Sequence, residues 1–328
     1  MKETLLKFLE SVQVGEPRYF AAMGIAPIFA QATTPLEYLT LDEAIGQGLF
    51  EVREVNQGGS VPNLKVVNRS GQKVLLLDGE ELVGAKQNRI LNADILLAEK
   101  SEIVIPVSCV ERGRWCYESR AFKSGGSVAP QQLRRAKATQ VHMSLARGRG
   151  FTSDQGAMWQ EIACMSSGLG VSSKTDSLHD VYTAKEKAFE EYLKAFPVVQ
   201  GANGFLFILN GEPFSSDLFD SASKMAKYWP KLVTSCALDA MTCAGGTRKE
   251  APLSDLKTIF DRAKEAEITV FDSPGLGKDL RIRGKEVAGA ALVYDSTVVH
   301  AELFNIEKAR SFESCMGSPS ERLRRREF

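Results

Sequence analysis

The chain has 328 residues, of which 44% are hydrophobic, and its 41 Lys and Arg residues equal its 41 Asp and Glu residues. This length can bury one large core or two ordinary ones, and balanced charge gives no overall field that would favour nucleic acid or an anionic membrane as a partner. No window approaches ~18 consecutive apolar residues, and the charged N-terminus lacks the apolar core of a signal peptide, so we expect a cytoplasmic protein without a membrane span.

Helical spacing of apolar residues over 1–13 predicts a short amphipathic helix. From Arg18 to about Tyr117 the pattern is mostly typical of strands. Within it, a helical turn is expected only at 41–45, where Thr40 and Glu43 form a capping box. The main strands expected in this part are 20–29, 49–52, 64–67, 74–77, 95–97 and 101–110.

Residues 118–127 contain Lys123-Ser-Gly-Gly-Ser, which predicts a flexible break. Three helices follow in the pattern, and then a hairpin signal at Asn210-Gly211 predicts two short strands around it. The later helical stretch is expected to be interrupted near Pro230. The helices expected after the break are 130–145, 153–165, one that ends before Pro197, 218–243 and 253–265, and the strands are 205–209, 267–272, 280–284, 287–294 and 298–304.

This order of elements does not alternate as in a parallel doubly wound sheet, so it predicts the α+β class. We expect a β-rich N-terminal half, a helical middle and a mixed C-terminal part that ends in an antiparallel meander. A single domain over 1–306 fits this pattern, and it could divide into a β-rich lobe at 14–120 and an α/β lobe at 128–306. Residues 307–328 are expected to be a disordered tail.

Residues 78–92 place ionic and amide side chains between two strongly apolar runs. One interpretation is the floor of a polar pocket, in which a guanidinium holds a phosphate or carboxylate and the amides bind hydroxyls. The other is an internal brace, in which Glu80 or Glu81 pairs with Lys86 or Arg89. In an extended strand Glu81, Gln87 and Arg89 would share one face, unless Gly84 bends the chain. The remaining amides of this segment are Asn88 and Asn92.

A second polar group ends the strand at 101–110, where Cys109 and Glu111 follow an apolar stripe and Arg114-Trp115 come next. A Trp beside an Arg can stack a base or a sugar ring, whereas Cys109 is expected to be a buried thiol rather than a nucleophile. On the helix at 153–165, Gln155 and Trp159 could add an amide and a second aromatic wall. Neither the six cysteines nor the three histidines have metal-ligand spacing, so no metal site is expected, and His300 is expected to face the less buried side of its strand.

Two segments carry a resemblance to a known family, Gly79-Glu-Glu-Leu-Val-Gly-Ala-Lys-Gln-Asn-Arg-Ile-Leu-Asn and Ile105-Pro-Val-Ser-Cys-Val-Glu-Arg-Gly-Arg-Trp. They resemble a bacterial family named for its association with ADP-ribosylglycohydrolases and rhodanese-phosphatase proteins, over about residues 10–305. The resemblance implies a ligand derived from ADP-ribose or NAD, and ADP-ribose-processing enzymes as partners. Its motifs include the following residues: Glu80, Glu81, Gly84, Lys86, Gln87, Asn88, Arg89, Asn92, Cys109, Glu111, Arg114 and Trp115.

Three functions are compatible with these residues, and none of them indicates a particular cofactor. The first is a binding or accessory protein for such a ligand or another phosphorylated nucleotide, with Arg89 and Arg114 on phosphates and Trp115 on the base. The second is a hydrolase of the same ligand, with Glu80, Glu81 or Glu111 as a general base. The third is a scaffold without a ligand, in which the polar motif only braces the fold.

Overall fold

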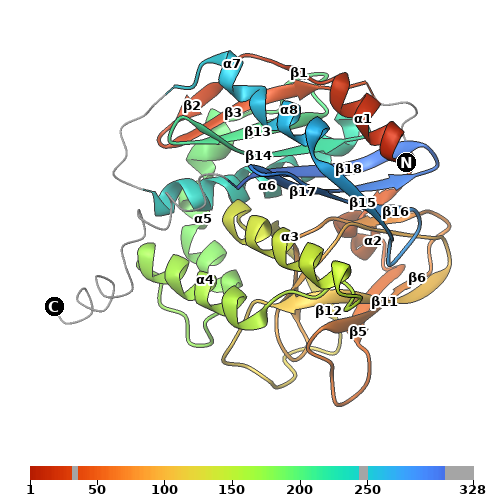
Figure 1. The fold of residues 1–328 in the computed structure, drawn as a ribbon. Helices are drawn as coiled ribbons and strands as arrows, with labels where there is room; N and C mark the ends of the chain where they lie inside the picture. Colours follow the sequence, from red (N-terminus) through yellow and green to blue (C-terminus); the bar gives the residue numbers. More distant parts are fainter. Residues whose placement is uncertain (32–35, 244–249, 307–328) are drawn as a thin grey trace.

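A computed structural model of the chain describes residues 1–31, 36–243 and 250–306 (Figure 1). They form a nine-stranded antiparallel sheet, a small closed β-barrel, a three-stranded sheet and helices. The α+β class is therefore confirmed. The tail expected at 307–328 lies outside the described residues, and the division into lobes stays a prediction. None of the described helices is long and apolar enough to cross a membrane.

The large sheet separates two layers of apolar core. In spatial order its strands are β1 (Gln13–Val14), β3 (Met23–Phe29), β13 (Gly204–Leu209), β14 (Glu212–Phe219), β18 (Thr297–Asn305), β17 (Val287–Tyr294), β16 (Lys278–Arg283) and β15 (Glu267–Asp272), while β2 (Arg18–Phe20) pairs with β3. Successive side chains of a strand point to opposite faces. Thus Leu206 and Ile208 of β13 belong to one core layer, and Phe205 and Phe207 to the other.

Helices cover both faces of this sheet. The predicted hairpin at Asn210-Gly211 and the final meander β15–β18 are both confirmed. On one face lie α1 (Lys2–Glu10), α7 (Leu253–Leu256) and α8 (Thr258–Glu265), and on the other lie α3 (Gln131–Ala146), α4 (Gln155–Gly168), α5 (Leu178–Ala195) and α6 (Ala222–Thr242), as Figure 1 shows.

The barrel has a buried apolar interior that includes Val52, Leu64, Leu82, Ile105 and Phe122. A three-stranded sheet and helix α2 (Leu41–Gly46) pack against it, and α2 begins with the capping box of Thr40 and Glu43 that the sequence predicted. In order around the barrel its strands are β11 (Ser101–Cys109), β6 (Asn63–Asn68), β5 (Phe50–Glu54), β12 (Phe122–Val128), β8 (Glu80–Gly84) and β9 (Arg89–Leu91). The small sheet comprises β10 (Ile95–Leu97), β7 (Val74–Leu76) and β4 (Leu39–Thr40).

Two expectations about local structure are wrong. Residues 122–127 of the predicted break instead belong to strand β12, whose register shifts between Ser124 and Val128. A side chain at Gly125 would come 2.5 Å from Glu81 Oε2, so a glycine is what lets this strand pass close to the carboxylate. Helix α6 also runs unbroken through Pro230. Its flanking turns are buried in the core, and we attribute the continuity to that packing, which outweighs a penalty of roughly 3 kcal/mol.

A network of buried charges joins the barrel, α3 and the large sheet. Arg134 of α3 donates from Nη2 to Asp217 Oδ1 at 2.6 Å and to Glu302 Oε2 at 2.7 Å. His300 contacts Asp94 Oδ2 through Nδ1 at 2.7 Å and Asp217 Oδ1 through Nε2 at 3.2 Å. The other buried members are the Lys137–Asp78 and Arg281–Asp279 ion pairs.

The structure corrects the expectation for His300, whose residue is 0% exposed. Burial alone would lower the pKa of His300, but the two carboxylates on its ring raise that pKa to about 9. Burial likewise opposes ionisation of Asp217, yet Arg134 and His300 lower the pKa of Asp217 to about 2. Strand alternation correctly predicted which face of the strand carries His300. It could not predict that this face is buried, because the Asp and Arg partners come from segments that lie far away in the sequence.

Replacing Arg134 should destabilise the fold strongly. Arg134→Ala leaves Asp217 and Glu302 as buried carboxylates without their guanidinium, which typically costs about 3–5 kcal/mol. We expect the free energy of unfolding, measured with urea, to fall by that amount or the protein not to fold. Lys187→Ala on the exposed side of α5 is the control and should change it by less than about 0.5 kcal/mol. A loss below about 1 kcal/mol for Arg134→Ala would contradict the role of this network.

Candidate functional site

The 78–92 segment is a hairpin rather than one extended strand. Gly84 and Ala85 have φ angles of 118° and 41°, and they turn the chain between β8 and β9. Across the hairpin Leu82 pairs with Arg89 and Glu81 pairs with Ile90. Arg89 therefore points with Leu82 into the barrel, while Glu81 points outward. Glu81 and Arg89 therefore do not share the face that an extended strand would give them, because the chain bends at Gly84.

Arg89 lies at one end of the barrel interior and is 0% exposed. Its Nη1 donates to the Gln87 carbonyl oxygen at 2.9 Å, and it also lies 3.3 Å from Gln87 Oε1 and from the Asn88 carbonyl oxygen. The other two guanidinium nitrogens, Nε and Nη2, have no hydrogen-bond partner among the described residues. The Trp115 ring lies over this group, 5.7 Å from Arg89 Cζ. A buried cation is thus left half satisfied.

Glu54 is a second unsatisfied ion at this end of the barrel, and we did not single it out from the sequence. It is 6% exposed, and its Oε1 accepts from the Lys86 main-chain N–H at 3.4 Å, while its Oε2 has no partner. Glu54 and Arg89 do not form an ion pair in the described part of the chain, although each influences the other electrostatically. Strand alternation could have identified Glu54 as an inward-facing residue, because it follows the buried Phe50 and Val52 on the same face of β5.

We call this region the barrel mouth and define it by Glu54, Lys86, Gln87, Arg89, Cys109 and Trp115. Trp115 is 46% exposed, and Lys86 Nζ lies 5.3 Å from its ring and 5.1 Å from that of the exposed Tyr117. The Cys109 thiol donates to Gln87 Oε1 at 3.1 Å. Burial raises the pKa of Cys109 to about 11, so at neutral pH it is a thiol rather than a nucleophilic thiolate.

A brace of hydrogen bonds lies beside the mouth. Arg114 donates to both carboxylate oxygens of Glu111, at 2.9 Å from Nε and 2.7 Å from Nη2, and Nη2 also reaches Asn88 Oδ1 at 3.1 Å. Burial would raise the pKa of Glu111, but hydrogen bonds from Arg114 and the Asn88 main chain lower it. Glu111 and Arg114 thus satisfy each other, which fits a structural pair better than a general base or a phosphate ligand.

Three further predicted residues also have partners within the protein. Asn92 donates to the Phe151 carbonyl oxygen at 2.9 Å and accepts from Ser108 at 2.7 Å. Gln155 uses both ends of its amide on the main chain of Cys109, at 2.8 and 2.6 Å. Arg112 lies over the ring of Trp159, with its Cζ 5.9 Å from the ring centre. Trp159 is therefore separate from the barrel mouth, of which Trp115 is a part.

Glu80 faces helix α6 instead of the barrel mouth. Lys231 Nζ lies 2.7 Å from both Glu80 Oε1 and Asp42 Oδ2, and the Leu77 N–H donates to Glu80 Oε2 at 2.9 Å. Burial raises the pKa of Glu80 although Lys231 opposes this shift. Both carboxylate oxygens are occupied, so Glu80 acts as a link between β8 and α6.

Glu81 forms a separate polar group with His179 and Ser127 on the outer side of the barrel. Its Oε2 accepts from Ser127 Oγ at 2.7 Å and from His179 Nδ1 at 3.0 Å, while its buried Oε1 has no partner. The His179 side chain is 34% exposed, so only the histidine of this pair is accessible. The hydrogen bond that His179 donates to Glu81 raises the pKa of His179, and Asp180 and Glu118 act in the same direction.

The titration of His179 should depend on Glu81. In Glu81→Gln we expect the pKa of His179, measured from its imidazole proton signals by NMR, to be lower than in the wild type. Because the folded-state pKa is raised, the pair adds stability below the unfolded pKa of about 6.5 and loses it as pH rises through the folded value. His142, whose pKa is lowered by burial, serves as an internal control and should titrate unchanged. An unshifted His179 would show that the contact with Glu81 is absent in solution.

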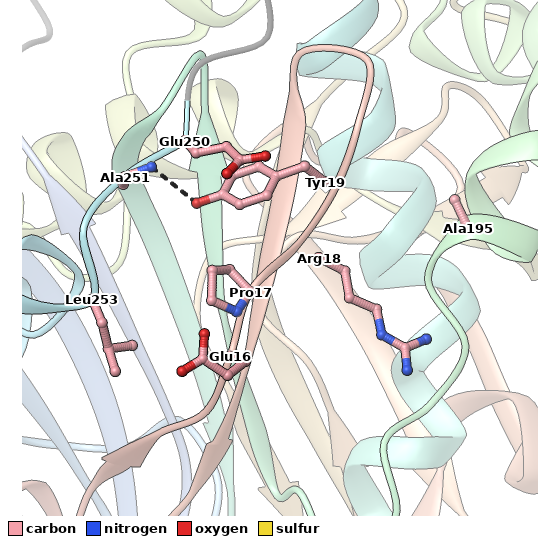
Figure 2. Close-up of a pocket in the computed structure, with 8 residues that line it drawn as sticks. All are labelled: Glu16, Pro17, Arg18, Tyr19, Ala195, Glu250, Ala251 and Leu253. Atoms are coloured by element: carbon pink, nitrogen blue, oxygen red, sulfur yellow. Dashed lines mark hydrogen bonds between the residues drawn. The ribbon is translucent and has the colours of Figure 1, made fainter.

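A hollow of about 580 Å³ lies elsewhere, between the start of β2 and the segment before α7 (Figure 2). The Ala251 N–H donates to Tyr19 Oη across it at 3.0 Å. None of the predicted site residues lines it. Its lining residues are Glu16, Pro17, Arg18, Tyr19, Ala195, Glu250, Ala251 and Leu253.

The fold and the barrel mouth together define an α+β protein in which a small barrel buries unpaired polar groups at one end. The family model described as ARG and Rhodanese-Phosphatase-superfamily-associated Protein domain, ARPP-1, matches residues 11–304. The chain therefore belongs to this family, which confirms the resemblance found in the sequence. The family name records an association with ADP-ribosylglycohydrolase (ARG) and rhodanese-phosphatase proteins. No curated protein and no solved structure matches the chain.

Proposed function

We propose that this protein is a binding or accessory protein whose barrel mouth takes a ligand derived from ADP-ribose or NAD, or another phosphorylated nucleotide. The observation that carries the proposal is the fully buried Arg89 guanidinium, of which Nε and Nη2 have no partner. The ligand would supply the missing acceptors.

The energetics of buried ions favour this proposal over a pure brace. A buried polar group without a partner costs about 1–3 kcal/mol, and a charged group costs more. A structural guanidinium would be expected to pair with carboxylates, as Arg134 does with Asp217 and Glu302 although its Nε has no partner. Arg89 and Glu54 lie at the same end of one small barrel without pairing. An interior that carries two such ions is explained more simply by a role in binding a ligand than by a gain in stability.

The side chains at the mouth suit a phosphorylated nucleotide. Two guanidinium nitrogens can donate to one phosphate in a bidentate arrangement, and Lys86 adds a second cation nearby. Trp115 and Tyr117, which are 46% and 51% exposed, offer aromatic surface on which a base could stack. The family association with ADP-ribosylglycohydrolase proteins makes ADP-ribose the first ligand to test and ADP-ribose-processing enzymes the first partners.

Arg89→Met separates the ligand site from a brace. The methionine should abolish or weaken ADP-ribose binding at least tenfold by isothermal titration calorimetry, because a hydrogen-bonded ion contact is typically worth about 1.5–3 kcal/mol. It should change the free energy of unfolding by less than about 2 kcal/mol, because it also removes a buried charge that is only partly paired.

Arg69→Met is the matched control, since Arg69 is an exposed partner of Glu51 on the same barrel, and it should bind ADP-ribose normally. If Arg89→Met unfolds the protein as Arg134→Ala is expected to do, the brace is favoured. Absence of wild-type binding at millimolar ADP-ribose, NAD and AMP would refute the proposed ligand class.

A hydrolase is the second candidate, and the pair of Glu81 and His179 favours it. A histidine held through Nδ1 by a buried carboxylate has Nε2 available to take a proton from an attacking water. On this alternative the ligand would bind on the outer side of the barrel beside His179, because the barrel mouth lies on the other face of the β8–β9 hairpin. The general base is then His179, which Glu81 orients, rather than a glutamate acting directly.

ADP-ribose turnover tests this alternative directly. His179→Ala should reduce release of AMP and ribose 5-phosphate, measured by chromatography, by about 10²–10⁴-fold while leaving ADP-ribose binding intact. His142→Ala is the control and should retain the wild-type rate. No release by the wild-type protein, or equal release by His179→Ala, would exclude His179 as the base.

A further inference from the structure

We infer that Glu54 makes the barrel mouth selective for a ligand that presents hydroxyl groups close to its phosphate, as an unsubstituted ribose does. This inference rests on the proposed binding function and names the chemical class that the site would accept. Glu54 would select the ligand by accepting hydrogen bonds from the sugar while Arg89 donates to the phosphate.

The carboxylate of Glu54 is arranged for an occupant. The residue is 94% buried, since only 6% of it is exposed, and its Oε2 has no hydrogen-bond partner. The Lys86 N–H approaches the other oxygen at 3.4 Å, which holds the side chain in place without using Oε2. Val52 lies on the same inward face of β5, so the carboxylate sits above an apolar floor and is not free to reach solvent.

Gly59 packs against this oxygen from the loop after β5. A side-chain carbon at position 59 would lie 3.4 Å from Glu54 Oε2, 3.3 Å from Trp115 and 3.0 Å from Lys86. Its φ of +78° is also one that a residue with a side chain rarely adopts. The backbone therefore passes close to the carboxylate and the indole at a residue that has no side chain to crowd them.

Glu54 and Arg89 require opposite hydrogen-bonding groups from a single ligand. A carboxylate only accepts hydrogen bonds and a guanidinium only donates them. A ligand that satisfies both must carry donors and an anionic acceptor close together. Inorganic phosphate is a poor occupant, because its charge would lie beside Glu54 without enough donors to offset the repulsion. A sugar phosphate has hydroxyl donors and a phosphate acceptor within one small group, and an acidic side chain on ribose hydroxyls is a known solution for nucleotides.

Paired ligands that differ only in their hydroxyls test this selectivity. Wild-type protein should bind AMP at least about tenfold more tightly than 2′,3′-dideoxy-AMP by isothermal titration calorimetry, because each lost donor leaves a buried charge unpaired. In Glu54→Gln the preference should shrink to less than threefold. The same substitution should tighten binding of inorganic phosphate severalfold, because a repelling charge has been removed. A purely structural role for Glu54 would not produce this opposite change.

Glu51→Gln is the matched control, since Glu51 lies on the same strand but pairs with the exposed Arg69, and it should keep the wild-type preference. Glu54→Met provides a second variant if Glu54→Gln does not fold. Equal binding of AMP and its dideoxy analogue by the wild type would overturn the inference and leave the proposed function standing. Absence of binding to AMP and ADP-ribose would overturn both.

Discussion

The arrangement of the whole molecule depends on pairing charges that packing has removed from water. Arg134 reaches from α3 to two carboxylates of the large sheet, and Lys137 reaches from the same helix to Asp78 beside the barrel. Such pairs add little net stability compared with apolar packing, but breaking one is expensive. They therefore fix the position of the barrel relative to the sheet, because a displaced arrangement would leave several ions buried without partners.

The barrel mouth differs from this network, because neither Arg89 nor Glu54 has an ion-pair partner among the described residues. Arg134 forms ion pairs with two carboxylates. In contrast, Nε and Nη2 of Arg89 and Oε2 of Glu54 have no hydrogen-bond partner among the described residues. The barrel walls keep the two ions in place but do not pair them. Strained or unsatisfied features tend to collect where a protein binds or transforms something. The mouth is thus defined less by a large hollow than by unmet hydrogen-bonding capacity.

The sequence could predict elements whose signal is local. The capping box of Thr40 and Glu43 and the Asn210-Gly211 turn are formed as expected. It failed where tertiary contacts override local preference. Helix α6 continues through Pro230, and the Gly-rich segment forms strand β12 by pairing with β8 and β5, with Gly125 close to Glu81. The polar motif was recognisable, but the pairing of its members was not, because the partners Lys231 and His179 are far from it in sequence.

Because of the β8–β9 hairpin, one short motif places side chains both inside the barrel and on its outer side. The turn at Gly84 and Ala85 sends Arg89 inward and leaves Glu81 outward, with His179 of α5 beside it. Binding at the mouth and proton transfer at His179 would then use different faces of the same hairpin. A ligand that rigidifies the turn from inside could alter the geometry of Glu81 outside, since the two strands are only a few residues long. Effects of mouth substitutions on His179 would therefore measure coupling through the hairpin rather than direct contact with a ligand.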